Sequence, residues 1–381
     1  MLIFRGLIAF DVSIASINQV LSDLPVTKCQ IALWPNRNKH IGMIMKRALS
    51  LMGMLFATVL TGTQAASASE YPLPPPDSRL IGENTTYTVP NDGRPLEAIA
   101  ADYKIGLLGM LEANPGTDPF LPKPGSVLTI PTQMLLPDTK REGIVVNLAE
   151  LRLYYYPKGE NKVIVYPIGI GQTGMHTPLQ VTSVSQKIPN PTWTPTANIR
   201  KRYLEKGVKL PGVVPAGPEN PMGLFAMRLA MGHGEYLIHG TNANFGIGMR
   251  VSSGCIRLRP TDIEALFNMV PRGTRVQVIN DPVKISVEPD GKRYVEVHQP
   301  LSRVESDDPQ TMPITLSKAE KAFVGDAQTD KAVFDSAVVR RSGMPVLVNV
   351  GQNPSDVSLT PVASQEANKG PFKGAPISSV N

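Results

Sequence analysis

The chain has little cysteine, with two among its 381 residues, Cys29 and Cys255. Cys29 lies in an N-terminal segment that we expect to be removed, so the mature protein keeps one cysteine and can form no internal disulfide. The sequence also lacks the His-Glu-x-x-His and Cys-x-x-Cys spacings that are typical of zinc sites. A zinc hydrolase that uses His233, His239 and Cys255 is therefore a disfavoured alternative.

No apolar run is long enough to span a membrane. Met-Lys-Arg at 45–47 precedes the apolar residues 48–60, a run of 13, whereas a spanning helix needs about 20. Ala-Ser-Ala at 66–68 offers a cleavage site, and no cysteine lies nearby for lipid attachment. This layout predicts a signal peptide over 45–68, export to the periplasm and no stable membrane anchor after cleavage. We interpret residues 1–44 as an extension from a start codon assigned too far upstream.

Positive charge is concentrated at the N-terminus. The chain carries a net charge of +6, but residues 1–68 hold six of the 38 basic and two of the 32 acidic residues. The nearly neutral remainder excludes nucleic acid as the main partner. The length and 42% apolar content of the whole chain predict two or three globular domains. The 36 prolines of the whole chain favour strands, turns and linkers over long helices.

The remaining cysteine and one histidine are the candidate catalytic residues. In an oxidising compartment structural cysteines normally pair, so an unpaired one indicates chemistry. The apolar run 235–238 predicts a buried strand that ends at His239, and a loop rich in Asn and Gly follows at 241–248. A second β-type segment then carries Cys255 beside it. Because a thiolate needs a base, this pattern predicts acyl transfer with Cys255 as nucleophile and His239 as base.

Neighbouring residues suggest how a substrate would be held. Gly254 lets the backbone approach a substrate closely, and the amides around Cys255 could bind an oxyanion. Arg257 could meet a substrate carboxylate, the alternative being an exposed charge on a strand. His176 and His233 lie in Gly-flanked turns and are expected to be solvated.

The order of elements predicts a mainly β fold with a β-sandwich or barrel-like body. A small α+β unit at 85–132 comes first, with the order strand, two short helices, strand. The body at 143–280 is predicted to contain strands, a polar Pro-rich loop and one helix. The strands are at 144–148, 151–156, 163–170, 224–227 and 274–279, the loop is at 192–221, and the helix follows a capping box at 261–264. A small α+β appendage at 283–350, including an alternating strand at 293–297, and a disordered tail at 351–381 complete the chain.

The unit at 85–132 resembles a LysM module. The matching residues are Tyr87-Thr88-Val89, Leu96-x-x-Ile99-Ala100 and Leu111-x-x-Asn114-Pro115-Gly116. The resemblance implies binding to the glycan of peptidoglycan. The alternative is a spacer domain with no retained binding groove.

His239-Gly240-Thr241 with Ser252-x-Gly254-Cys255-Ile256-Arg257 resembles the YkuD-type L,D-transpeptidases, and the domain order resembles their ErfK/YbiS/YcfS/YnhG branch. The resemblance implies that Cys255 attacks the diaminopimelate carbonyl of a peptidoglycan tetrapeptide stem without a cofactor. D-Alanine leaves, and an amine resolves the thioester. The implied acceptor is the C-terminal lysine of murein lipoprotein or a second stem.

The resemblance also implies roles for the other motif residues. The backbone around Gly240 would orient the imidazole, and Ser252, Ser253 and Arg257 would contact substrate. Many family members carry His at the position of Ser253. A non-catalytic peptidoglycan-binding protein and an L,D-carboxypeptidase or endopeptidase remain alternatives, whereas a papain-like peptidase is disfavoured because its Cys precedes its His.

Overall fold

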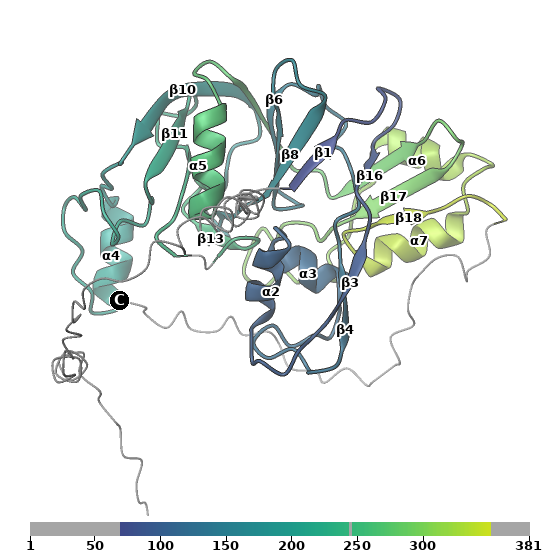
Figure 1. Cartoon of the computed structure of the whole chain (residues 1–381), viewed down its shortest axis with the longest axis horizontal. Coiled ribbons are helices and arrows are strands. Elements are labelled where there is room, and N and C mark those ends of the chain that lie inside the picture. Colours follow the sequence, from purple (N-terminus) through teal and green to yellow (C-terminus); the bar gives the residue numbers. More distant parts are fainter. Residues whose placement is uncertain (1–68, 244–245, 352–381) are drawn as a thin grey trace, which may run out of the picture. The chain divides into compact units, whose positions relative to one another are not determined.

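The computed structural model describes residues 69–243 and 246–351 (Figure 1). The predicted signal peptide, the segment before it and the tail from residue 352 lie outside the described residues. Across the two described ranges, no helix has the length and apolar character needed to cross a bilayer.

A nine-stranded sheet organises the described part of the chain, and the mainly β prediction is confirmed. The strand order is β1-β8-β7-β6-β15-β10-β11-β12-β14. The pairs β15–β6 and β12–β14 are parallel, and the other neighbouring pairs are antiparallel. The strands are β1 (Ser69–Pro72), β6 (Gly143–Asn147), β7 (Arg152–Tyr156), β8 (Lys162–Pro167), β10 (Val181–Pro189), β11 (Phe225–Leu229), β12 (Leu237–His239), β14 (Ile256–Arg257) and β15 (Arg275–Ile279).

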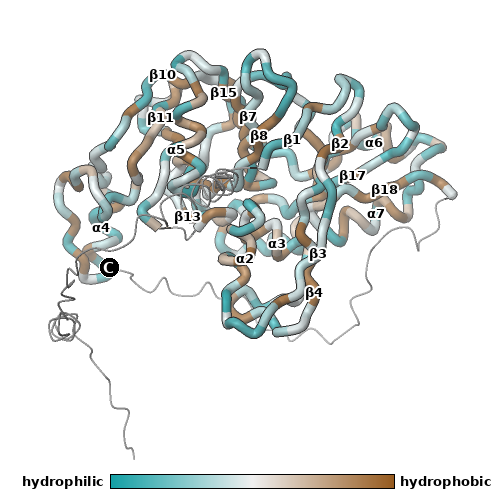
Figure 2. The backbone as a smooth tube through the Cα atoms, viewed as in Figure 1, coloured by the Kyte–Doolittle hydropathy of each residue, from teal (hydrophilic) through white to brown (hydrophobic). Residues whose placement is uncertain are grey.

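The central strands are buried on both faces, which explains their nearly continuous apolar sequences. Alternate side chains of β6 and β7 enter two separate cores, with Ile144 and Leu153 in one and Val145 and Tyr154 in the other. The first core is covered by α5 (Pro260–Met269). The second is covered by residues beside the short pair β2 (Leu80–Ile81) and β5 (Met134–Leu135). Figure 2 shows hydrophobic residues along β8 and β15.

The 85–132 segment has its own core and follows the predicted order. Antiparallel β3 (Thr85–Thr88) and β4 (Val127–Ile130) flank α2 (Leu96–Asp102) and α3 (Leu107–Ala113). The segment also contacts the loop between β12 and β14, because the Leu108 amide donates to the Gly248 carbonyl at 3.2 Å.

The 283–350 segment forms a three-stranded sheet with two helices beside it (Figure 1). Its elements are β16 (Val283–Val287), β17 (Arg293–Val297), β18 (Pro345–Leu347), α6 (Lys318–Gly325) and α7 (Lys331–Arg340). Phe323 and Phe334 from the helices pack with Val295 of the sheet in a fourth apolar core.

Two local predictions are wrong. The polar loop at 192–221 contains a helix, α4 (Ala197–Glu205), whose first turn is capped by the Thr196 hydroxyl. The predicted capping box at 261–264 is absent, since α5 begins one residue earlier at Pro260 with Arg259 as N-cap. Proline suits this first position because its missing N–H would have no helical partner.

Candidate active site

The parallel pair β12–β14 places His239 at the end of one strand and Cys255 directly before the other. In the β12–β14 pair, Ile238 lies opposite Ile256 and His239 opposite Arg257. Both isoleucines point into the core. Because side chains alternate along a strand, His239 and Arg257 point to the opposite face, and Cys255 lies directly before β14.

The His239 imidazole is buried, with 5% of its surface exposed, and is held by the backbone. Its Nδ1 lies 2.6 Å from the Gly240 carbonyl oxygen, so Nδ1 carries a proton and donates it there. This tautomer leaves Nε2 free to accept a proton. Burial, and then the positive charge of Arg257, lower the pKa of His239 to about 4. The imidazole is therefore a neutral base at physiological pH.

The Cys255 thiol is partly buried and stays protonated at rest. Its Sγ donates to the Glu235 carbonyl oxygen at 3.4 Å. Burial raises the pKa of the Cys255 thiol, which outweighs the lowering by the Leu237 backbone and by Arg257. A protonated thiol and a neutral imidazole point to proton transfer during attack rather than to a preformed ion pair.

Hydrogen bonds within the chain fix the turn that precedes Cys255. The buried Ser252 hydroxyl donates to the Cys255 carbonyl at 2.5 Å and accepts from the Gly254 amide at 3.2 Å. Gly254 has φ +105°, a left-handed conformation that favours glycine, and its carbonyl accepts from Thr177 at 2.8 Å. Because the Gly254 amide is already bonded, the Cys255 amide is the better candidate for an oxyanion.

The missed helix α4 reaches this turn. Arg202 donates through Nη2 to the Ser253 hydroxyl at 3.3 Å, and the Ser253 side chain is otherwise exposed. A cationic side chain thus stands beside the Ser253 hydroxyl. The Thr196 N-cap was the available signal for α4, but the flanking prolines hid it.

Arg257 is the candidate for binding a substrate carboxylate. Its side chain is partly buried, and its Nε has no hydrogen-bond partner among the described residues. A buried guanidinium N–H without a partner is costly, so a carboxylate would be stabilised here.

His176 and His233 are exposed, as expected. Among the described residues, His233, His239 and Cys255 do not form a group with metal-ligand spacing. The geometry therefore gives the zinc-hydrolase alternative no support.

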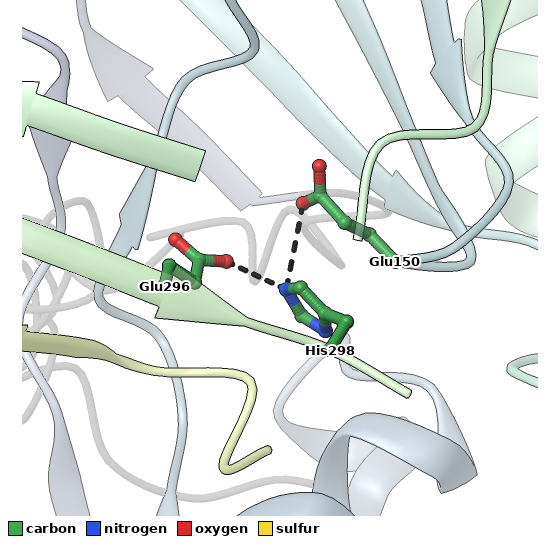
Figure 3. Close-up of side chains that lie close together, drawn as sticks. All are labelled: Glu150, Glu296 and His298. Atoms are coloured by element: carbon green, nitrogen blue, oxygen red, sulfur yellow. Dashed lines mark hydrogen bonds and ion pairs between the residues drawn. The ribbon is translucent and has the colours of Figure 1, made fainter. Parts of the chain in front are cut away.

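The group that does have such spacing consists of Glu150, Glu296 and His298 (Figure 3). The Lys284 ammonium already lies between the two carboxylates, 2.9 Å from Glu150 and 3.0 Å from Glu296. Arg152 contacts the same two carboxylates at 3.0 and 2.9 Å. Two side-chain cations thus occupy the place that a metal ion would take.

His298 completes the network as a third cation. It contacts Glu112 at 2.9 Å and Glu296 at 2.8 Å. Although burial opposes its charge, Glu112 and Glu296 raise the pKa of His298 to about 9. Three acidic and three basic side chains therefore neutralise one another, and they join the 85–132, 143–280 and 283–350 segments. We call these six residues the buried charge network: Glu112, Glu150, Arg152, Lys284, Glu296 and His298.

The protonation states predict how Cys255 reacts with iodoacetamide. The alkylation rate should keep rising beyond pH 8.5, the ordinary thiol pKa, because burial raises the pKa of Cys255. His239→Gln should leave the midpoint nearly unchanged, since a neutral imidazole does not stabilise a thiolate by charge. Mass spectrometry of samples quenched between pH 5 and 10 measures both rates. A rate plateau by pH 6 that requires His239 would instead demonstrate an ion pair.

Comparison with known proteins follows the same division of the chain. Residues 141–278 match the family model of the L,D-transpeptidase catalytic domain, and residues 282–348 match that of the L,D-transpeptidase C-terminal domain. The probable L,D-transpeptidase YcfS of Escherichia coli K12 is 61% identical over 76% of this chain and 92% of its own length. The probable L,D-transpeptidase YbiS of the same strain is 56% identical over 74% of this chain and 93% of its own length. The probable L,D-transpeptidase ErfK/SrfK of that strain is 54% identical over 77% of this chain and 95% of its own length.

Proposed function

The chain belongs to the L,D-transpeptidase family, and from this premise we propose that it forms a thioester between Cys255 and a peptidoglycan stem peptide and passes the acyl group to an amine. The observation that carries the proposal is a neutral, buried His239 at the end of β12, whose neighbouring strand β14 begins directly after Cys255. This placement also favours catalysis over the alternative of a non-catalytic wall-binding protein.

In the first half-reaction the Cys255 sulfur attacks the diaminopimelate carbonyl of a tetrapeptide stem. The thiol proton passes to Nε2 of His239, which the Gly240 carbonyl holds in the accepting tautomer. The oxyanion that forms is stabilised by the Cys255 amide. The carbon–nitrogen bond then breaks, His239 returns the proton to the departing amine, and D-alanine leaves.

In the second half-reaction an acceptor amine attacks the thioester and loses a proton to His239. The carbon–sulfur bond breaks, and the proton returns to Cys255. The energy of the original amide is kept in the thioester, so no ATP is needed outside the cytoplasm. The acceptor is the C-terminal lysine of murein lipoprotein or the side-chain amine of a second stem. Transfer to water instead would make the protein an L,D-carboxypeptidase or endopeptidase.

The remaining segments suit a periplasmic enzyme. The predicted signal peptide exports the chain, and Cys255 is the one cysteine of residues 69–381. The LysM-like segment at 85–132 would hold the enzyme on the glycan while stems are processed. This segment donates two hydrogen bonds to the loop before Cys255, from the Leu107 amide to Ile247 and from the Leu108 amide to Gly248. These contacts support an arrangement in which the glycan-binding segment and the active-site loop are held together.

Incubation of the purified enzyme with tetrapeptide muropeptides and a lipoprotein C-terminal peptide tests the proposal. Intact-mass analysis should detect a stem acyl group on Cys255 and a joined product, with D-alanine released in equal amount. Hydrolysis product alone would favour the carboxypeptidase alternative, and no adduct or product would contradict the proposal.

The Arg202–Ser253 contact predicts a smaller effect. Arg202→Ala should lower kcat/KM by about 2- to 10-fold, the range expected for one partly exposed hydrogen bond. The reason is that Ser253, two residues before the nucleophile, loses its cationic partner. Lys201→Ala on the same helix is the matched control, because Lys201 is exposed. Equal activity of both variants would show that the contact does not matter for catalysis.

A further inference from the structure

A cavity lies next to the turn that precedes Cys255. Its volume is about 180 Å³, and neither Cys255 nor His239 lines it. Its walls come from the parallel pair β9 (Ile170–Gly171) and β13 (Arg250–Ser252), the loop at 176–179, and residues 301–303. One water needs roughly 10–15 Å³ of such space, so the cavity can admit a ligand of amino-acid size.

The charged side chains that line the cavity carry no negative charge. Arg250, Arg303 and the titratable His176 are present, and no Asp or Glu belongs to the described lining residues. The nearby Asp307 carboxylate instead accepts from the backbone amides of Arg303 and Val304, at 2.7 and 3.1 Å. The cavity therefore favours an anion.

Arg250 is the best-placed group to bind that anion. It is partly buried, and burial lowers its pKa, as expected for a cation that has no carboxylate partner. Its Nη1 donates to the Ser302 carbonyl at 2.9 Å, which fixes the guanidinium at the cavity wall. A planar guanidinium matches a carboxylate with two parallel hydrogen bonds.

The rest of the wall is largely apolar. Leu148, Ile170, Leu179 and Leu301 line it together with the cationic groups. A bare inorganic anion would leave these side chains unused, whereas a carboxylate attached to a small apolar group would contact both kinds of wall.

We propose that this cavity binds the carboxylate end of a small amino acid or short peptide and that the bound ligand acts on the Cys255 turn. Two wall residues make the connection. Thr177 donates to the Gly254 carbonyl at 2.8 Å, and Gly171 is so close to Gly254 that an added Cβ would lie 3.1 Å from its Cα. The turn before the nucleophile therefore forms part of the cavity's support. The binding itself does not depend on the proposed thioester chemistry.

Calorimetric titration of the intact chain with N-acetyl-D-alanine and N-acetyl-L-alanine tests the binding. At least one should bind, and neutral N-acetylalaninamide should bind at least tenfold more weakly. Arg250→Gln should weaken binding at least tenfold, and Arg303→Gln severalfold, whereas exposed Lys158→Gln should not change it. Arg303→Gln is the second variant because it should leave the fold intact: no side-chain hydrogen bond holds Arg303 among the described residues. Equal binding of the amide, or unchanged binding by both arginine variants, would overturn the proposal.

Two further variants separate this site from catalysis and test the connection. Cys255→Ala should bind the ligand as the wild type does, so binding survives even if the thioester mechanism is wrong. Saturating ligand should change the rate of Cys255 alkylation at least twofold in the wild type. In Thr177→Val the same ligand should leave the alkylation rate unchanged. An unchanged alkylation rate in the wild type would contradict the action on the turn.

Discussion

Cys255→Ala is expected to abolish acyl transfer, with a loss of about 10⁴-fold or more, the scale seen when a covalent nucleophile is removed. The reason is that the thioester cannot form without the sulfur. The measurement is the rate of D-alanine release from tetrapeptide muropeptides, together with the intact mass of the enzyme. The mass should show the acyl adduct in the wild type and not in the variant.

His239→Gln serves as the companion variant. A positioned base contributes about 10²- to 10⁴-fold, so this variant should be slower than the wild type by that factor and still form the adduct. Both variants should unfold at nearly the wild-type temperature, because neither side chain belongs to the apolar cores. Wild-type D-alanine release from folded Cys255→Ala protein would refute Cys255 as the nucleophile.

Lys284→Met is expected to destabilise the protein by about 3–5 kcal/mol, the range observed when one partner of a buried ion pair is removed. Lys284 is fully buried and contacts both Glu150 and Glu296. Its loss leaves two buried carboxylates with too little positive charge around them. Burial favours protonation, but Lys284 and Arg152 at present hold the pKa of Glu150 below its usual value.

Urea unfolding at pH 7 measures this effect. The matched control is Lys292→Met, whose ion pair with Asp290 is exposed and should contribute nothing measurable. Adding Glu150→Gln to Lys284→Met should restore part of the stability, because it removes one of the uncompensated charges. Equal midpoints for the Lys284 and Lys292 variants would mean that the buried charge network does not stabilise the fold.

The sequence was most informative where local pattern and chemistry coincide. The apolar run before His239 predicted a strand that ends there, and the structure pairs this strand, β12, with β14, which begins directly after Cys255. The short helices α2 and α3 were predictable because they bury Leu96 and Met110 in a core formed within their own segment.

Long-range pairing could not be read from the sequence in the same way. Glu296 in β17 is 0% exposed. Its partners Glu150 and Arg152 lie about 145 residues earlier, and nothing local indicates that they meet. The Arg202–Ser253 contact was missed for the same reason, since it needs both α4 and the distant turn.

The position of β15 has a consequence for how the protein acquires its activity. In the sheet order, β15 is the one link between the group β1-β8-β7-β6 and the group β10-β11-β12-β14 that carries the catalytic pair. It pairs with β6, which precedes it by about 130 residues. Closing so large a loop is slow. We therefore expect folding to be rate-limited by insertion of β15, with the unjoined halves exposed to proteases until then.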